Sequence, residues 1–281
     1  MIKFISENIN LNNYLFISVV GTFALIISIS YSLTNDVFAQ QNLTNIVNTN
    51  TNTNSNTNAN NQPNINAENI FNTKTLTSGG NIKDLVILIP NEGHHAAGED
   101  KESRFLDQHF VPENAIINTG TTVSWFNGDV GHERTIDVKD TDGSNSLFNT
   151  GKITDMQLSP TYTFDKPGVY NYEAQGDPGV IMRGTITVVD NLSSPVTSSD
   201  GNSAIDTVGI LMVPTQDIDK YVQEIQNAGL TVDSRHDFKD LRGGQKGTGD
   251  VQSLIVWTSE GKDLNSIIPP ISQLSSSLPY S

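Results

Sequence analysis

Short runs of apolar residues alternate with turn residues through the middle of the chain. The runs are rich in β-branched and aromatic residues: KDLVILIP (83–90), NAIINTG (114–120), TTVSWFN (121–127), RTIDVKD (134–140), TYTFDKPGVYNYEA (161–174) and MRGTITVVD (182–190). Turn pairs such as Asp142-Gly143 and Pro167-Gly168 separate them. Regularly spaced short strands joined by such turns predict a mainly β domain, a β-sandwich or a barrel, over residues 81–190.

The pattern changes after a Ser-rich linker at residues 191–204. A buried strand (206–214) is followed by TQDIDKYVQEIQNAG (215–229), where apolar residues recur at helical spacing and Gly229 provides a stop. Two further strands (230–234 and 251–259) and a helix broken at Pro269-Pro270 (262–276) complete the segment. We therefore expect a small α+β domain over residues 205–281.

The first 80 residues differ from both domains. An uncharged apolar run at 14–33 precedes Val37-Phe38-Ala39, which suits signal peptidase, so residues 1–39 are expected to be a signal peptide. The run is also long enough for a membrane anchor, the alternative reading. Residues 40–80 are rich in Asn and Thr and predict a disordered spacer. The chain is therefore expected outside the cytoplasm, either secreted or tethered to the outer face of the membrane.

Charge and composition exclude several classes of function. The chain carries 16 Lys+Arg against 31 Asp+Glu, a net charge of −15, which argues against binding to nucleic acid. It contains no cysteine, so it has no disulfide, thiolate metal site or thiol nucleophile. The glycine-rich stretch at 242–249 does not match a phosphate-binding loop, and no nucleophile-elbow motif is present. We do not expect an enzyme, and the sequence identifies no protein partner for the C-terminal segment.

The order of motifs in the β domain resembles that of the cupredoxins, the family of plastocyanin and azurin. FVPENAIINTGTTVSWFNGDVGH (110–132) is similar to the family's F-x-P, glycine turn, V-x-W-x-N and His pattern, and MRGTITV (182–188) to its closing strand. The resemblance implies a cupredoxin-like Greek-key β-sandwich and a copper site with His132 as first ligand. It places Ala174 where the family has Cys, Asp177 where it has the second His, and Met182 where it has Met. Without the thiolate a blue copper centre is excluded.

Histidines near the same end of the sandwich suggest a rebuilt site. Four of the five histidines lie between residues 94 and 132. A tight hairpin at Thr119-Gly120 would place His109 opposite residue 130, beside His132. His94 and His95, in the loop at 91–103, could fold over the same end. Carboxylates that could add oxygen ligands are those of Glu92, Glu99, Asp100, Asp129, Glu133 and Asp177.

Imidazoles with carboxylates suit Cu(II) or Zn(II). We therefore predict a non-blue metal site that draws its ligands from His132, His109, His94, His95, Asp177 and Met182. Copper is favoured by the resemblance, and zinc remains an alternative. Two other functions stay open: an electron-transfer cupredoxin and a metal-free surface module on the same scaffold.

Overall fold

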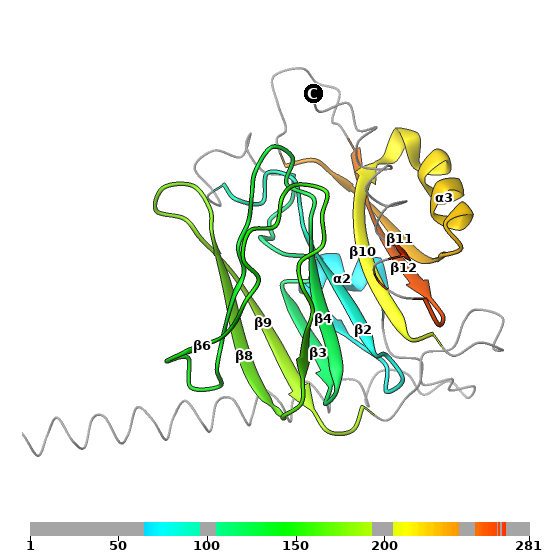
Figure 1. Cartoon of the computed structure of the whole chain (residues 1–281). Coiled ribbons are helices and arrows are strands. Elements are labelled where there is room, and N and C mark those ends of the chain that lie inside the picture. Colours follow the sequence, from blue (N-terminus) through cyan, green and yellow to red (C-terminus); the bar gives the residue numbers. More distant parts are fainter. Residues whose placement is uncertain are drawn as a thin grey trace, which may run out of the picture. The chain divides into compact units, whose positions relative to one another are not determined.

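Two six-stranded sheets form the described part of the chain in the computed structural model (Figure 1). The structure describes residues 65–95, 105–192, 205–241, 251–262, 264 and 266–267. These residues belong to one compact unit that spans Asn61–Ser281. The mainly β sandwich predicted from the sequence is confirmed.

The first sheet contains strands from the N-terminal half and the closing hairpin of the sandwich. In spatial order its strands are β1 (Thr75–Thr77), β3 (Asn114–Asn118), β9 (Ile181–Val189), β8 (Gly168–Gln175), β5 (Asp137–Lys139) and β6 (Ser146–Asn149). β3 pairs with β9 in parallel, while β8 and β9 form an antiparallel hairpin. Alternate residues of β9 are buried, as expected for a strand with one face on the core.

The second sheet joins the sandwich to the C-terminal segment. Its order is β11 (Thr231–Lys239), β12 (Val251–Ser259), β10 (Thr207–Pro214), β2 (Asp84–Ile89), β4 (Thr121–Asn127) and β7 (Tyr162–Phe164). β10 pairs in parallel with β2, and β2 pairs in parallel with β4. The strands expected in a separate α+β domain therefore continue a sheet of the sandwich.

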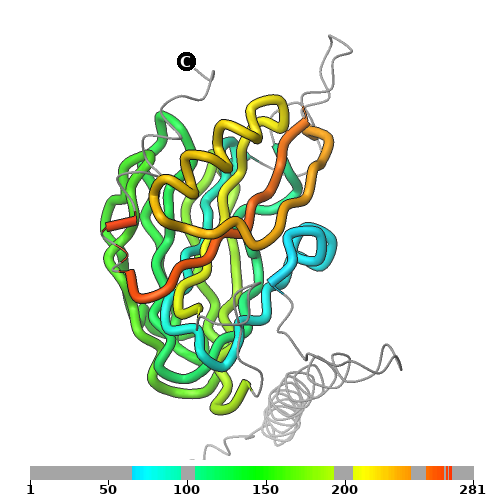
Figure 2. Tube along the Cα trace, turned by 90° about the vertical axis from the view of Figure 1, so that its right-hand side faces the viewer, coloured from blue at the N-terminus to red at the C-terminus, as the bar shows by residue number. Residues whose placement is uncertain are grey.

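Two helices accompany this extension of the second sheet. α3 (Ile218–Asn227), preceded by the 3₁₀ turn η1 (Thr215–Asp217), buries Ile218, Tyr221 and Ile225, which confirms the predicted amphipathic helix. Figures 1 and 2 show α3 lying along the outer side of β10, β11 and β12. The helix expected at 262–276 is helical at residues 264 and 266–267, and the rest of it lies outside the described residues.

Ordered structure begins earlier than the sequence predicts. Helix α2 (Ala67–Thr73) and β1 occupy residues assigned to the disordered spacer at 40–80, and that part of the prediction was wrong. The Asn66 side chain caps α2 by accepting from two backbone N–H groups. Ile70 is fully buried, and the Phe71 ring stacks on Phe238 of β11 at 5.0 Å between centroids. A few apolar residues within a polar background are enough to dock this segment.

The hairpin predicted at Thr119-Gly120 was also wrong. β3 lies in the first sheet and β4 in the second, so the turn crosses between sheets and does not pair the two strands. Gly120 has a φ of +88°, which suits the sharp change of direction. The register estimate that placed His109 opposite residue 130 therefore does not apply.

The expected N-terminal signal or anchor, residues 1–39, lies outside the described residues. Within the part of the chain that the structure describes, no helix is both long enough and apolar enough to cross a membrane.

Candidate metal centre

Three loops meet at one end of the sandwich. Residues 91–95 follow β2, residues 128–132 follow β4, and residues 176–180 connect β8 to β9. Because β2 and β4 are parallel, the loops after them leave the same edge of the sheet. The Asp177 N–H donates to the His94 carbonyl oxygen at 3.0 Å, which ties the third loop to the first.

His94 lies at the centre of this cluster. Its side chain is buried, and its ring lies between those of His95 and His132, with centroid distances of 4.1 and 4.2 Å. The Nδ1 atom of His94 is 2.8 Å from Oδ2 of Asp129. The structure thus brings together three of the four histidines predicted as ligands.

Asp129 is a fully buried carboxylate with several donors around it. Arg134 donates to Oδ2 through Nε at 2.9 Å and through Nη2 at 2.6 Å. Burial alone would raise the pKa of Asp129, but the hydrogen bond from His94 and the charge of Arg134 outweigh it and hold the pKa below its ordinary value. The carboxylate is therefore ionised at neutral pH and acts as an acceptor.

His95 is held between two carboxylates. Its Nδ1 lies 2.6 Å from Oδ2 of Asp177, and its Nε2 lies 2.7 Å from Oε2 of Glu92. Glu92 adopts a positive φ of 59°, which helps turn the loop back over the site. His95 thus links the loop after β2 to the β8–β9 loop, and a metal ion bound to His95 would have to replace one of these contacts.

His132 is the most exposed histidine of the cluster, with 47% of its side chain accessible. Its Nδ1 is 3.1 Å from the Val130 carbonyl oxygen and 3.7 Å from Oδ1 of Asp129. The Asn127 amide donates to the His132 carbonyl oxygen at 2.8 Å and fixes the backbone of the loop. His132 therefore covers the solvent side of His94.

The remaining predicted ligands lie elsewhere. Nδ1 of His109 is 2.7 Å from the Gly93 carbonyl oxygen, so His109 supports the loop that carries His94. Met182 is fully buried in the hydrophobic core and pairs across the β8–β9 hairpin with Ala174. Assignment of either residue as a ligand stays a prediction.

The chemistry of the cluster suits a borderline metal ion. Ligand atoms of Glu92, His94 and His95 lie within 4.8 Å of one another, and so do those of His94, Asp129 and His132. Imidazole nitrogens with carboxylate oxygens fit Cu(II) or Zn(II), whereas a blue copper centre requires a thiolate that this chain does not contain.

Arg134 was not anticipated from the sequence. It follows His132 by two positions, and a basic residue there gives no signal of a buried ion pair. Of the carboxylates considered as extra oxygen ligands, Glu133 instead pairs with Lys152 at 2.6 Å, and both side chains are exposed. Glu99 and Asp100 lie outside the described residues.

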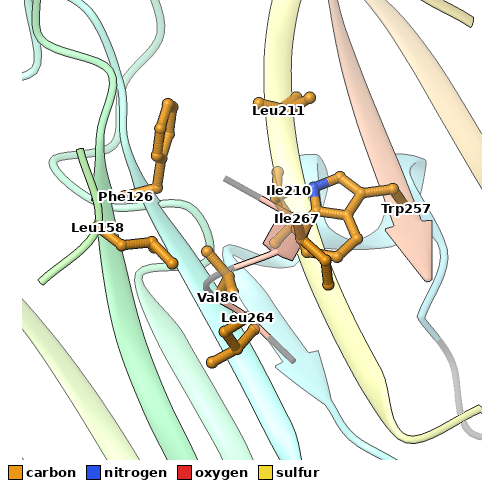
Figure 3. A pocket seen from close by; sticks show the side chains of 8 residues that line it. All are labelled: Val86, Phe126, Leu158, Ile210, Leu211, Trp257, Leu264 and Ile267. Carbon is orange, nitrogen blue, oxygen red and sulfur yellow. The ribbon is translucent and has the colours of Figure 1, made fainter. Parts of the chain in front are cut away.

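A small apolar pocket lies against the second sheet (Figure 3). Its walls come from β2, β4, β10, β12, Leu158, Leu264 and Ile267. None of its lining residues is a histidine or a carboxylate, so the pocket does not belong to the candidate metal centre.

Comparisons with solved structures give partial matches to copper proteins. No family model matches the chain, and no curated protein matches it. A purple cupredoxin from Nitrosopumilus maritimus is 29% identical over 38% of this chain and 100% of its own, with a TM-score of 0.30. Reduced rusticyanin is 20% identical over 41% of this chain and 85% of its own, with a TM-score of 0.30.

A Cu-containing nitrite reductase from Thermus scotoductus SA-01 also matches. It is 21% identical over 43% of this chain, with a TM-score of 0.31, and the match covers 29% of the reductase. The present chain thus matches less than a third of that enzyme. The fold of the present chain is a sandwich of two β sheets, with the second sheet extended by β10, β12 and β11.

Proposed function

We propose that this protein binds a transition-metal ion through a non-blue histidine and carboxylate site at the loop end of the sandwich. His94 and His132 provide the imidazole ligands, and Asp177 provides an oxygen ligand. The resemblance of the sequence to the cupredoxins favours copper, and Zn(II) is the alternative. The role is binding and not catalysis.

One observation carries this proposal: the packing of three imidazoles and their carboxylates at one place. His94 touches both His95 and His132, and Oδ1 of Asp177 lies 3.9 Å from Nε2 of His94. Histidines on separate loops have no need to converge for stability, because each could remain solvated. A metal ion bound by several of these side chains would account for their proximity.

The donor set also bears on redox chemistry. Imidazole and carboxylate favour Cu(II), whereas soft sulfur ligands favour Cu(I). Ala174 offers no sulfur, and Met182 is packed in the core. We therefore propose that the site holds a divalent ion without rapid electron transfer.

Export is part of the same proposal. The apolar run at residues 14–33, followed by the small residues near Ala39, supports secretion or tethering to the outer face of the membrane. In that location the metal ion would come from outside the cytoplasm. Detection of the protein in an extracytoplasmic fraction, with Gln40 as its first residue, would establish export with cleavage.

Metal content tests the proposed function. The full chain, purified without a histidine tag, should contain about one copper or zinc ion by mass spectrometry and should lack the intense colour of a thiolate copper site. The variants His94→Ala and His132→Ala should each lose the ion. His236→Ala is the matched control, because that histidine lies on β11 and stacks on Phe71. A chain that takes up neither ion would refute the proposal.

A further inference from the structure

We propose that Asp129, held in place by Arg134, fixes the tautomer of His94, so that Nε2 and not Nδ1 binds the metal ion. The metal-binding half of this inference rests on the proposed function, whereas the tautomer can be tested without metal. Asp129 is thereby a positioning residue that acts through His94. The resemblance to the cupredoxins implies His132 as the first ligand, whereas it assigns no role to His94.

The hydrogen bond between Asp129 and His94 has one direction. Oδ2 of Asp129 already accepts two hydrogen bonds from the guanidinium of Arg134, so this oxygen acts as an acceptor toward His94 as well. The proton in the 2.8 Å contact must therefore reside on Nδ1 of His94. A neutral imidazole carries one proton, so Nε2 keeps its lone pair for a metal ion. In metal-bound histidines, the N–H group of the second ring nitrogen commonly donates a hydrogen bond to a carboxylate in this way.

Asp129 already accepts four hydrogen bonds from protein groups. Oδ2 accepts from His94 and twice from Arg134, and Oδ1 accepts from the Glu92 N–H at 3.0 Å. The carboxylate has no exposed surface, and Arg134 is 8% exposed. Direct coordination by Asp129 would weaken its bonds to a buried guanidinium, which is costly. Asp129 is therefore better suited to orient His94 than to bind the ion.

Nε2 of His94 points toward Asp177 of the β8–β9 loop. It lies 3.9 Å from Oδ1 of Asp177, which is too far for a hydrogen bond. His132 shows the same orientation, because its Nδ1 faces the Val130 carbonyl oxygen at 3.1 Å. Both rings thus direct Nδ1 toward fixed oxygens of the protein. The donor atoms of the site are accordingly the two Nε2 nitrogens, with the Asp177 oxygen beside them.

Histidine NMR tests the tautomer directly. The chain has five histidines, so ¹⁵N-histidine labelling of the full chain gives few signals, and loss of a signal in His94→Gln assigns His94. At about pH 8, metal-free His94 should show a protonated Nδ1 and an unprotonated Nε2. Addition of Zn(II) should shift the Nε2 resonance. A protonated Nε2 in the metal-free protein would overturn the inference.

Asp129→Asn tests the positioning role. The amide can turn its NH₂ group toward His94, which favours the other tautomer and places the proton on Nε2. Zn(II) affinity measured by calorimetry should fall about 10- to 100-fold, the usual effect of losing such a partner. The control is Glu133→Gln, which also removes one negative charge near the site but leaves His94 untouched. An equal loss in the control would show a general charge effect and overturn the inference.

The outcomes separate the two proposals. If the wild-type chain binds neither Zn(II) nor Cu(II), the proposed function fails, while the NMR spectrum of metal-free His94 still decides the tautomer. If the chain binds Zn(II) and the Nδ1 resonance shifts instead, the function stands and the inference fails. Should Asp129→Asn not fold, the wild-type spectra decide alone.

Discussion

A single glycine allows the β8–β9 loop to approach His94. A Cβ atom added at Gly176 would lie 2.4 Å from the His94 carbonyl oxygen, well inside normal contact distance. This oxygen also accepts the Asp177 N–H, so it cannot move without loss of that bond. Glycine at 176 is therefore required for the loops to meet.

We expect Gly176→Ala to separate the two loops and to weaken Zn(II) binding at least tenfold, because His94 and Asp177 would no longer face each other. Overpacking of this kind destabilises a protein by about 1–3 kcal/mol. Calorimetry and urea unfolding measure the two effects. Gly143→Ala is the control, since Gly143 has a φ of +75° but no atom near its Cβ. It should lower stability without changing affinity, and an unchanged affinity in Gly176→Ala would contradict the prediction.

The ionisation of Asp137 makes the unfolding free energy of the protein depend on pH. Burial acts to raise the pKa of Asp137, but hydrogen bonds from Lys139 and Ser146 outweigh it and lower the pKa. A carboxyl with a lowered folded-state pKa stabilises the protein above its unfolded value of about 3.9, and this stability disappears as the pH falls through the folded value. Wild type should therefore exceed Asp137→Asn in unfolding free energy at neutral pH.

The difference between these two proteins is the quantity to measure. Urea unfolding from about pH 7 to 5 should give a constant difference, which should then shrink below the ordinary carboxyl pKa of about 3.9. Glu133→Gln serves as the comparison. Its partner Lys152 lies on the exposed surface, and an exposed ion pair contributes little to the unfolding free energy. A difference for Asp137→Asn that grows on acidification would reverse the assigned sign.

The sequence predicted which candidate ligands lie together where their positions along the chain were enough to place them at one end of the sandwich. His94, His95, His132 and Asp177 were expected at one end, and the structure brings them together. The pairing of Asp129 with Arg134 was not predictable, because a buried ion pair depends on how the chain folds around it. Met182 followed from the family spacing, yet its side chain lies in the core.

At the scale of elements, the packing of Trp257 on β10 joins the C-terminal strands to one another. Gly209 of β10 pairs with Trp257 of β12, and a Cβ atom at 209 would lie 2.0 Å from the indole ring. Trp257 is 1% exposed, so its ring is packed inside the protein. A glycine in a central strand is thus explained by close contact with an aromatic ring.

Gly209→Ala should lower the unfolding free energy by about 1–3 kcal/mol, the usual cost of overpacking. Trp257→Leu should also destabilise the protein, but the double variant should lose less than the sum, because the smaller side chain makes room for the methyl group. Urea unfolding of all four proteins gives the coupling energy. Strict additivity would show that the ring does not limit position 209.

Elements were predictable where a local pattern defines them. α3 follows from its apolar spacing, and β4 and β12 match the predicted runs at 121–127 and 251–259. Helix α2 was missed because its apolar residues are few and its neighbours are Asn and Thr. The β3–β4 hairpin was wrong because both strands take partners distant in sequence, and a short turn does not reveal which sheet follows it.

At the scale of the whole molecule, the C-terminal strands complete the second sheet. β10 lies against β2 through Thr207–Gly209, and the backbone N–H groups of Lys83 and Asp84 donate to the Asp206 carbonyl oxygen. Five of the six residues of β2 are buried. A sheet that ended at β2 would expose a long apolar edge strand, which promotes association. The β sandwich is therefore expected to depend on residues 205–281.

Truncation tests this dependence. A chain of residues 61–192 should form oligomers or aggregate, and should unfold at a lower urea concentration than residues 61–281, because β2 would lose its β10 neighbour. Size-exclusion chromatography with light scattering and urea unfolding measure both effects. A second truncation, residues 81–281, removes α2 and the Phe71–Phe238 contact but keeps β10, so it should lose stability and stay monomeric. A monomeric 61–192 chain with unchanged stability would instead show that the sandwich folds independently, as the sequence pattern alone suggests.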